Sequence, residues 1–149
     1  MADSDLIQLY SGRILALAAD IAHVGRLVAP QGTAKRRSPL CGSSVTVDVV
    51  LEGGRIAAFA QDVKACALGQ AAASVLGAVA VGRSRAEVEG ARDALRAMLK
   101  GAGEAPAAPF GGYGVLIPAR EYKNRHASIM LAIEATVDAM VAAEQAATA

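Results

Sequence analysis

Apolar residues near the N-terminus recur every three or four positions along the chain. They are Leu6, Tyr10, Ile14, Leu17 and Ile21. This spacing gives one apolar stripe, and it predicts a helix from about Asp5 to His23. Ser4 or Asp5 is suited to cap the N-terminus of that helix, because a short polar side chain can accept a hydrogen bond from a free backbone amide.

The middle of the chain changes to a period of two. An apolar series alternates with a mostly polar one, which predicts a strand with one buried face. The apolar series is Val45, Val47, Val49 and Leu51, and the other is Thr46, Asp48, Val50 and Glu52. Gly53-Gly54 predicts a tight turn, after which Arg55 to Val63 returns as the partner strand. Thr33 to Ser38 is predicted to add a third strand. Such a small sheet is marginal by itself, so helices must cover one of its faces.

The remainder of the chain is predicted to be largely helical. The alanine-rich stretch from Cys66 to Val81 forms one helix. Ser84 begins another that ends near Leu99, and Glu87 completes a capping box. Gly101 to Gly114 holds five glycines and two prolines and is predicted to be a flexible loop, closed by Pro118. A last helix is expected from Asn124 to Gln145, followed by a tail that frays. The expected fold class is α+β, with a three-stranded antiparallel sheet and helices packed on one face.

Composition narrows the class of protein. The chain has 149 residues, 54% of them hydrophobic, which fits one domain over 1–149. The net charge of +1 is too small to imply a nucleic-acid or membrane partner. The one basic run, Lys35-Arg36-Arg37, favours a solvated strand edge or a docking patch for an acidic protein surface. The N-terminus is acidic and the apolar stretch from Ala65 to Val81 is interrupted, so we expect a cytoplasmic protein without a targeting or transmembrane segment.

Each of the two cysteines stands at a junction between predicted elements. Cys41 precedes Gly42 in a turn before the alternating strand, and Cys66 opens the alanine-rich helix. A hairpin brings the start of one strand beside the end of the next, so we expect the two thiols to meet at one end of the sheet. A helix N-terminus also favours the thiolate form. A lone cysteine is more often a small buried apolar residue, but two that converge favour chemistry.

Several short motifs stand in a fixed order along the chain. They are Leu6 to Ile14, Ser38-Pro39-Leu40-Cys41-Gly42, Ala65 to Ser74, Pro118-Ala119-Arg120 and Arg125-His126. In this order they resemble the motifs of the iron–sulfur cluster assembly scaffolds, the family of the NifU N-terminal domain, IscU and SufU. The second motif is similar to the family turn Pro-x-Cys-Gly-Asp. The helix and loop inserted after Cys66 resemble SufU more than IscU.

The resemblance implies a site of three cysteines and one aspartate that binds zinc or an iron–sulfur cluster. It also implies two kinds of partner, a cysteine desulfurase that delivers sulfur as a persulfide and acceptor apo-proteins. This chain departs from the pattern at two positions, with Ser43 in place of the aspartate and Ala127 at or near the third cysteine. Serine is a poor ligand and alanine cannot coordinate.

The residues that remain define the expected site. Cys41 and Cys66 would hold the metal, cluster or persulfide, and Cys41 would accept the sulfur. His126 stands where IscU carries a histidine, so it is either a third metal ligand or a capping and packing residue at a helix start. His23 has no cysteine near it in sequence and is expected at the surface.

Three functions compete at this point. The first is a scaffold or sulfur carrier in iron–sulfur cluster assembly. The second is a degenerate, metal-free family member that binds or regulates a cysteine desulfurase. The third, a thiol redox protein, is disfavoured because Cys-x-x-Cys is absent. The sequence has no catalytic triad, phosphate loop or paired-carboxylate motif, so at most a sulfurtransferase-like acceptor activity is expected.

Overall fold

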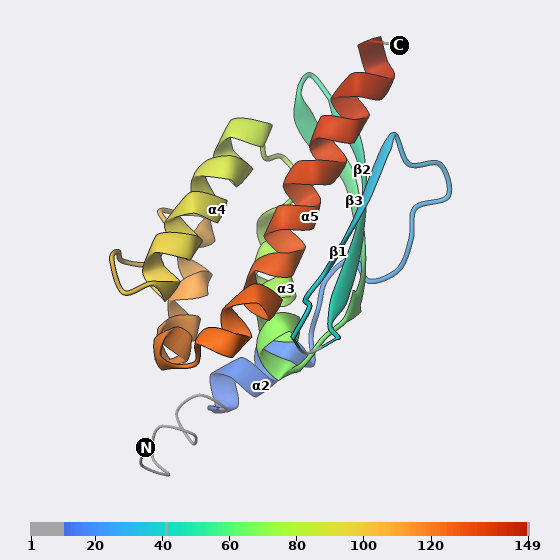
Figure 1. Cartoon of the computed structure of the whole chain (residues 1–149). Helices are drawn as coiled ribbons and strands as arrows, with labels where there is room; N and C mark the ends of the chain where they lie inside the picture. The colour runs from blue at the N-terminus through green and yellow to red at the C-terminus, as the bar shows by residue number, and fades with distance from the viewer. Residues whose placement is uncertain (1–10, 41, 149) are drawn as a thin grey trace.

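The structure of the protein is a computed structural model that describes residues 11–40 and 42–148. Figure 1 shows how the helices and strands of the described residues are arranged. In chain order they are α2 (Gly12–Ala18), β1 (Gly32–Arg37), β2 (Ser44–Glu52), β3 (Arg55–Lys64), α3 (Ala67–Val79), α4 (Arg85–Leu99), the 3₁₀ helix η1 (Phe110–Glu121) and α5 (Lys123–Thr148).

The three strands form one antiparallel sheet in the order β1-β2-β3. The predicted strands are confirmed, and β2 and β3 are joined by Gly53 and Gly54, whose φ angles are 59° and 78°. Both angles lie in the left-handed region, which glycine adopts without steric cost. The predicted apolar face of β2 is confirmed, because Val45, Val47 and Val49 are almost completely buried. The opposite face is not exposed throughout, because Asp48 is fully buried as well.

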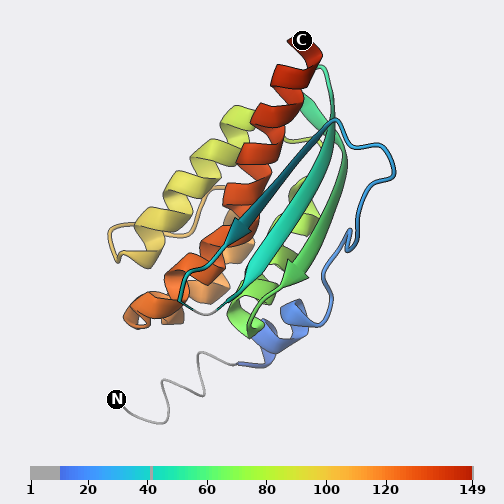
Figure 2. The ribbon, with the colours of Figure 1, turned by 45° about the vertical axis from the view of Figure 1, so that its right-hand side comes forward.

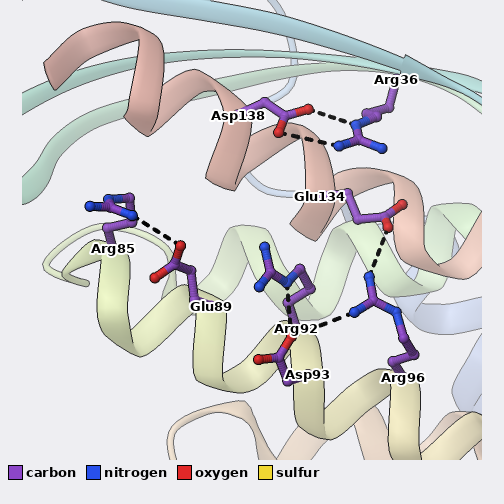
Figure 3. Close-up of polar contacts among 8 residues, drawn as sticks. All are labelled: Arg36, Arg85, Glu89, Arg92, Asp93, Arg96, Glu134 and Asp138. Atoms are coloured by element: carbon purple, nitrogen blue, oxygen red, sulfur yellow. Dashed lines mark hydrogen bonds and ion pairs between the residues drawn. The ribbon is translucent and has the colours of Figure 1, made fainter. Parts of the chain in front are cut away.

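Helices α3 and α5 lie on one face of the sheet, and α4 packs outside α5 (Figure 1). The predicted α+β class with helices on one face is therefore confirmed. Ion pairs bind α5 to its neighbours on both sides (Figure 3). Arg96 of α4 donates to Glu134 of α5 at 3.1 Å, and Arg36 of β1 donates to Asp138 of α5 at 2.6 Å.

Helix α5 is the centre of the packing. It extends through Thr148, past the predicted end at Gln145, and the expected fraying is not seen among the described residues. By length and composition it could cross a membrane, but 67% of its most apolar window is buried inside the molecule. Ile129, Ile133 and Met140 are fully buried, as expected of a core helix.

The prediction for the first helix was wrong at its C-terminal end. Helix α2 begins after the cap Ser11 and ends at Ala18, not at His23. The chain leaves the helix because it pairs with the edge of β3 instead. Gln61 donates its amide to the His23 carbonyl at 2.9 Å, and its own carbonyl accepts from Gly25 at 2.8 Å. The predicted caps Ser4 and Asp5 lie outside the described residues.

The prediction of a flexible loop over 101–114 was wrong for its last five residues, 110–114. Residues from Phe110 onward form η1, which buries one side chain in every three: Phe110, Tyr113, Leu116 and Ala119. A 3₁₀ helix has three residues per turn, so these side chains line up on one face. The three-residue period was not recognised in the sequence because the segment is rich in glycine.

A buried carboxylate fixes the segment between α2 and β1 to the sheet. Asp48 of β2 is fully buried on the face away from the helices, and it accepts hydrogen bonds from Arg26 (2.7 and 3.0 Å), Thr33 Oγ1 (2.6 Å) and the Leu27 amide (3.0 Å). The Arg26 hydrogen bonds hold the pKa of Asp48 below its ordinary value although burial opposes ionisation, and Thr33 and Leu27 contribute in the same direction.

Replacing Asp48 with Ala should therefore destabilise the fold by about 2–4 kcal/mol, because several donors lose a buried charged acceptor. A carboxylate with a lowered folded-state pKa stabilises the protein above its unfolded pKa of about 3.9, and that stabilisation is lost as the pH falls through the folded-state pKa. Urea unfolding at pH 7 and at lower pH measures both effects. Asp93→Ala, at an exposed position, is the control and should cost under about 0.5 kcal/mol. Equal losses for the two variants would contradict this account.

Candidate functional site

The turn between β1 and β2 and the start of α3 lie at the same end of the sheet. The turn is closed by a 2.8 Å hydrogen bond from the Ser38 amide to the Ser43 carbonyl. Ser44, at the start of β2, pairs with Lys64, the last residue of β3. The chain then reaches Cys66 within two residues, so the elements that flank both cysteines meet where the sequence predicted.

Cys66 is the N-cap residue of α3. Its φ and ψ angles of −67° and 171° are extended, and its carbonyl accepts the first helical hydrogen bond, from the Gln70 amide at 2.9 Å. The residue is half-buried and its thiol is free. At this position the thiol faces the unpaired amides of the first helical turn, which carry the positive end of the helix dipole.

Two serine hydroxyls extend from the thiol into the interior. Cys66 Sγ lies 3.5 Å from Ser128 Oγ on α5, and Ser128 Oγ donates to Ser43 Oγ at 3.2 Å. Ser43 and Ser128 are only 4% and 1% exposed, so both hydroxyls are buried while Cys66 is half-buried. The row links the turn before β2, the start of α3 and the start of α5.

Gly69 allows the two helices to approach closely enough for this contact. A Cβ at position 69 would lie 2.6 Å from Ser128 Oγ and 2.8 Å from Ala65 Cβ, closer than real side chains come. The glycine in the alanine-rich run is therefore required by the packing of α3 against α5. Any larger residue there would push Ser128 away from Cys66.

The surroundings of Cys66 favour the thiolate. Burial opposes ionisation, but the hydrogen bond with Ser128, those from the amides of Gly69 and Leu68, and the positive charge of Arg125 together lower the pKa of the Cys66 thiol. A thiolate is the form that attacks sulfur and binds soft metals. The site can therefore supply a nucleophile or a ligand at position 66.

The structure directs His126 toward η1 and not toward this row. His126 Nε2 lies 2.9 Å from the Ala119 carbonyl of η1, in the capping and packing role that the sequence left open. Positions 126 and 128 are about 200° apart around a helix, so Ser128 rather than His126 faces Cys66. Ala127 and His126 both border a cleft that also contacts Lys100 and Glu134. A ligand role for His126 stays a prediction.

The other predicted site residue, Cys41, lies outside the described residues. The meeting of its thiol with that of Cys66 therefore also stays a prediction. Within residues 11–40 and 42–148, no group of three or more His, Cys, Asp or Glu side chains is arranged to hold a metal. His23 is exposed, as expected, and its ring meets Phe59 edge-on with 6.1 Å between centroids.

Sequence reasoning missed Ser128 altogether and treated Ser43 only as a poor ligand. The signal available for Ser128 was a hydroxyl in an otherwise apolar stretch of α5, before Ile129, Met130 and Leu131. A buried polar group of this kind needs a partner. Here its partners are Cys66 and Ser43.

Comparison with known proteins identifies the family. No protein-family model matches the sequence, and no curated protein matches it either. Among solved structures, a nitrogen-fixing NifU-like protein (N-terminal) from Brucella abortus is 40% identical, with a TM-score of 0.91; the match covers 95% of this chain and 98% of that one. The chain belongs to the family of NifU-like N-terminal domains. The resemblance carried by the ordered motifs is thereby confirmed.

More distant structures share the fold of this NifU-like chain. A protein described as a putative iron–sulfur cluster assembly scaffold for the SUF system, from Fervidobacterium islandicum AW-1, is 18% identical, with a TM-score of 0.78 over 90% of this chain and 98% of that one. A hypothetical protein is 22% identical, with a TM-score of 0.79 over 91% and 98%. At these identities the likeness is one of fold alone.

Replacing Ser128 with Ala in this NifU-like chain should raise the pKa of Cys66. The Ser128 hydroxyl has one proton, which it donates to Ser43 here; once Cys66 is ionised, the hydroxyl can rotate and donate that proton to the thiolate, and the variant loses this donor. At pH 7 a smaller fraction would be thiolate, so alkylation by iodoacetamide should slow. The measurement is the alkylation rate against pH in a Cys41→Ser background, where Cys66 is the one remaining thiol. Ser74→Ala, another buried serine hydroxyl that bonds the Asp20 carbonyl at 3.1 Å, is the matched control. Identical profiles for Ser128→Ala and the parent would show that Ser128 does not act on the thiol.

Proposed function

We propose that this NifU-like chain is a scaffold or sulfur carrier in iron–sulfur cluster assembly, holding a persulfide, metal or cluster on Cys41 and Cys66. The observation that carries the proposal is the placement of Cys66, a half-buried thiol at a helix N-terminus with a lowered pKa and a hydroxyl partner in Ser128. Membership of the NifU-like family supports the same function. The proposal takes 1–149 as one domain in the cytoplasm, with a cysteine desulfurase and acceptor apo-proteins as partners.

Chain connectivity supports a joint site for the two cysteines. Ser43 bonds Ser128, which in turn contacts Cys66. Two residues span at most about 7 Å, so we expect Cys41 to lie within reach of Cys66. Its neighbour Leu40 is 72% exposed and Gly42 is exposed as well, which favours Cys41 as the thiol that an incoming persulfide meets first.

The transfer step is a thiol–persulfide exchange. The Cys41 thiolate attacks the outer sulfur of the desulfurase persulfide, and a new S–S bond forms as the donor S–S bond breaks. The donor cysteine leaves as a thiolate and takes up a proton equivalent to the one that Cys41 gave up. The transferred sulfur keeps its own proton, so the step consumes no oxidant or reductant. Cys66, already biased to thiolate, is then placed to receive the sulfur or to bind iron beside it.

Metal or cluster is the cargo of such a scaffold, and this donor set would hold it weakly. Cys41 and Cys66 supply two thiolates, and His126 can join them only by releasing Ala119. Three thiolates and a carboxylate would give a more anionic site, so we expect weaker binding than in a complete site and release as the pH falls.

A second function is favoured by one specific observation. Ser43 and Ser128 hydrogen-bond to each other where the family site would carry an aspartate ligand near Cys66. A chain that fills its ligand position with paired hydroxyls is suited to a metal-free role, as a binding or regulatory module for the desulfurase. Metal analysis of the anaerobically purified protein separates the two functions, since about one equivalent of zinc or iron supports the scaffold and none supports the module.

Persulfide formation tests the sulfur-carrier role directly. After incubation with cysteine desulfurase and cysteine, mass mapping should place the added sulfur on Cys41, because exchange depends on access as well as on the thiolate fraction. Cys41→Ser should remove most of the label and Cys66→Ser should leave it in place. Sulfur confined to Cys66, or absent from both cysteines, would overturn the assignment of Cys41.

Restoring the lost ligands tests the metal site. Ser43→Asp combined with Ala127→Cys should increase zinc affinity by several kcal/mol, of the order contributed by completing a structural site. Zinc titration against a chromophoric chelator measures the gain. The same double variant with Cys66→Ser is the matched control and should lose it, and His126→Ala in the natural chain should abolish weak binding. A restored variant that binds no more zinc than the natural chain would favour the binding module.

A further inference from the structure

The sheet has a second face, away from α3 and α5, and the described residues cover only half of it. The segment between α2 and β1 lies along this face and its edge (Figure 2). It is held there by Arg26 and Leu27 on Asp48 and by the pairing of Val24 with Gln61. The half that no described segment crosses, here called the uncovered half, is the end of the sheet next to Cys66.

Two cross-strand rows make up this uncovered half. In one row Lys35 pairs with Thr46, which pairs with Asp62; in the other Arg37 pairs with Ser44, which pairs with Lys64. Directly paired residues of antiparallel strands lie on the same side of the sheet, and residues two apart on one strand do so as well. The two rows therefore share one face.

The orientation of that face follows from the ion pair of Arg36. Arg36 turns toward α5, where its guanidinium bonds Asp138 at 2.6 and 3.3 Å (Figure 3). Side chains alternate along a strand, so Lys35 and Arg37 point to the opposite side. Within the basic run, Arg36 thus packs against α5, whereas Lys35 and Arg37 point outward.

The outward cations have no ion-pair partner in the part of the chain that the structure describes. Lys35, Arg37 and Lys64, which we call the cationic face, are exposed, and none of them forms an ion pair with another described residue. Asp62 is the one acidic residue in the two rows. Most arginines elsewhere are paired; they are Arg26, Arg36, Arg55, Arg83, Arg85, Arg92 and Arg96.

We propose that the cationic face is the docking surface for an acidic surface of the sulfur-donating cysteine desulfurase. The inference rests on the function proposed above and adds the side of the sheet from which the desulfurase approaches. Lys64 precedes Cys66 by two residues, and Arg37 stands at the start of the 38–43 turn. A partner seated on Lys35, Arg37 and Lys64 thus lies beside the end of the sheet where both cysteine-bearing segments begin. Complementary charge of this kind raises the rate of encounter and fixes orientation.

Two other roles for these charges make different predictions. A nucleic-acid site would need a wider basic surface than three cations, and the net charge of the chain is only +1. Charges on an edge strand such as β1 also prevent sheet-to-sheet aggregation. That role predicts self-association when they are changed, whereas docking predicts a monodisperse protein that binds its partner weakly.

The test compares two double charge reversals of equal size. Lys35→Glu with Arg37→Glu changes the cationic face. Arg92→Glu with Lys100→Glu changes α4 and its C-cap residue, and α5 lies between α4 and the sheet (Figure 1). Circular dichroism and size-exclusion chromatography first establish that both remain folded and monodisperse. Affinity for the purified desulfurase is then measured at low and high salt, and persulfide transfer is measured at subsaturating and saturating desulfurase. Binding to a labelled single-stranded RNA is measured in parallel.

We expect the cationic-face variant to lose about tenfold in affinity at low salt and much of its salt dependence, with the α4 variant close to wild type. Transfer should recover at saturating desulfurase, because docking rather than chemistry is impaired. Lys64→Glu alone should weaken binding in the same direction. The proposal would be overturned if the two double variants had equal effects or if neither had an effect. It would also be overturned if the cationic-face variant self-associated, or if that variant alone lost RNA binding.

The result for wild type distinguishes this inference from the function beneath it. Suppose that the wild-type chain accepts sulfur and that the cationic-face variant accepts it equally well at every desulfurase concentration. This result refutes the docking surface and leaves the carrier function standing. A wild-type chain that neither binds the desulfurase nor accepts sulfur refutes both.

Discussion

The closeness of α5 to the sheet and to α3 is the constraint on which the rest of the structure depends. At Gly32, on β1, an added Cβ would overlap the Ala139 carbonyl and lie 2.8 Å from Ala143 Cβ. At Gly69, on α3, it would meet Ser128. Backbone therefore lies almost against backbone along α5, which explains why the core is built from Ala, Val, Leu and Ile with few aromatic residues. Such a core positions its helices precisely because little side-chain volume separates them.

That proximity also creates the chemistry of the site. Ser128 is buried on the first turns of α5, and only a close approach of α3 brings its hydroxyl to the thiol of Cys66. Burial alone would raise the pKa of the thiol, so the hydrogen bond, the helix amides and Arg125 must outweigh it. The same contact holds Ser43, two residues from Cys41, at the site. The packing of the helices, the lowered pKa of Cys66 and the position of the 38–43 turn thus have one common cause, which is the close approach of α5 to α3 and to the sheet.

Much of the fold was predictable from the sequence because it follows local rules. The strand alternation around Val47, the glycine turn and the Ser84 capping box each appear as predicted, and the cap is closed in both directions between Ser84 and Glu87. The failures arose where distant contacts override local preference. Helix α2 stops early because Gln61 offers backbone partners 38 residues beyond His23 (61 − 23), and η1 forms because α3 and α4 bury every third residue of a glycine-rich segment. In the site, Cys66 was predictable from its place before a helix. The role of Ser128 was not, because it depends on a contact with Cys66 62 positions away in sequence.

The central claim is that Cys41 and Cys66 form one site at the Ser128 end of the sheet, and their ability to form a disulfide tests it most directly. A disulfide needs Cα atoms within about 7 Å, and the chain has only these two cysteines. Mild oxidation of the dilute native protein, followed by non-reducing mass analysis, should give a monomer that has lost two hydrogen atoms, with a Cys41–Cys66 cross-linked peptide. Cys66→Ser should abolish that product. A native chain that keeps two free thiols, or that forms only intermolecular dimers under these conditions, would contradict the account.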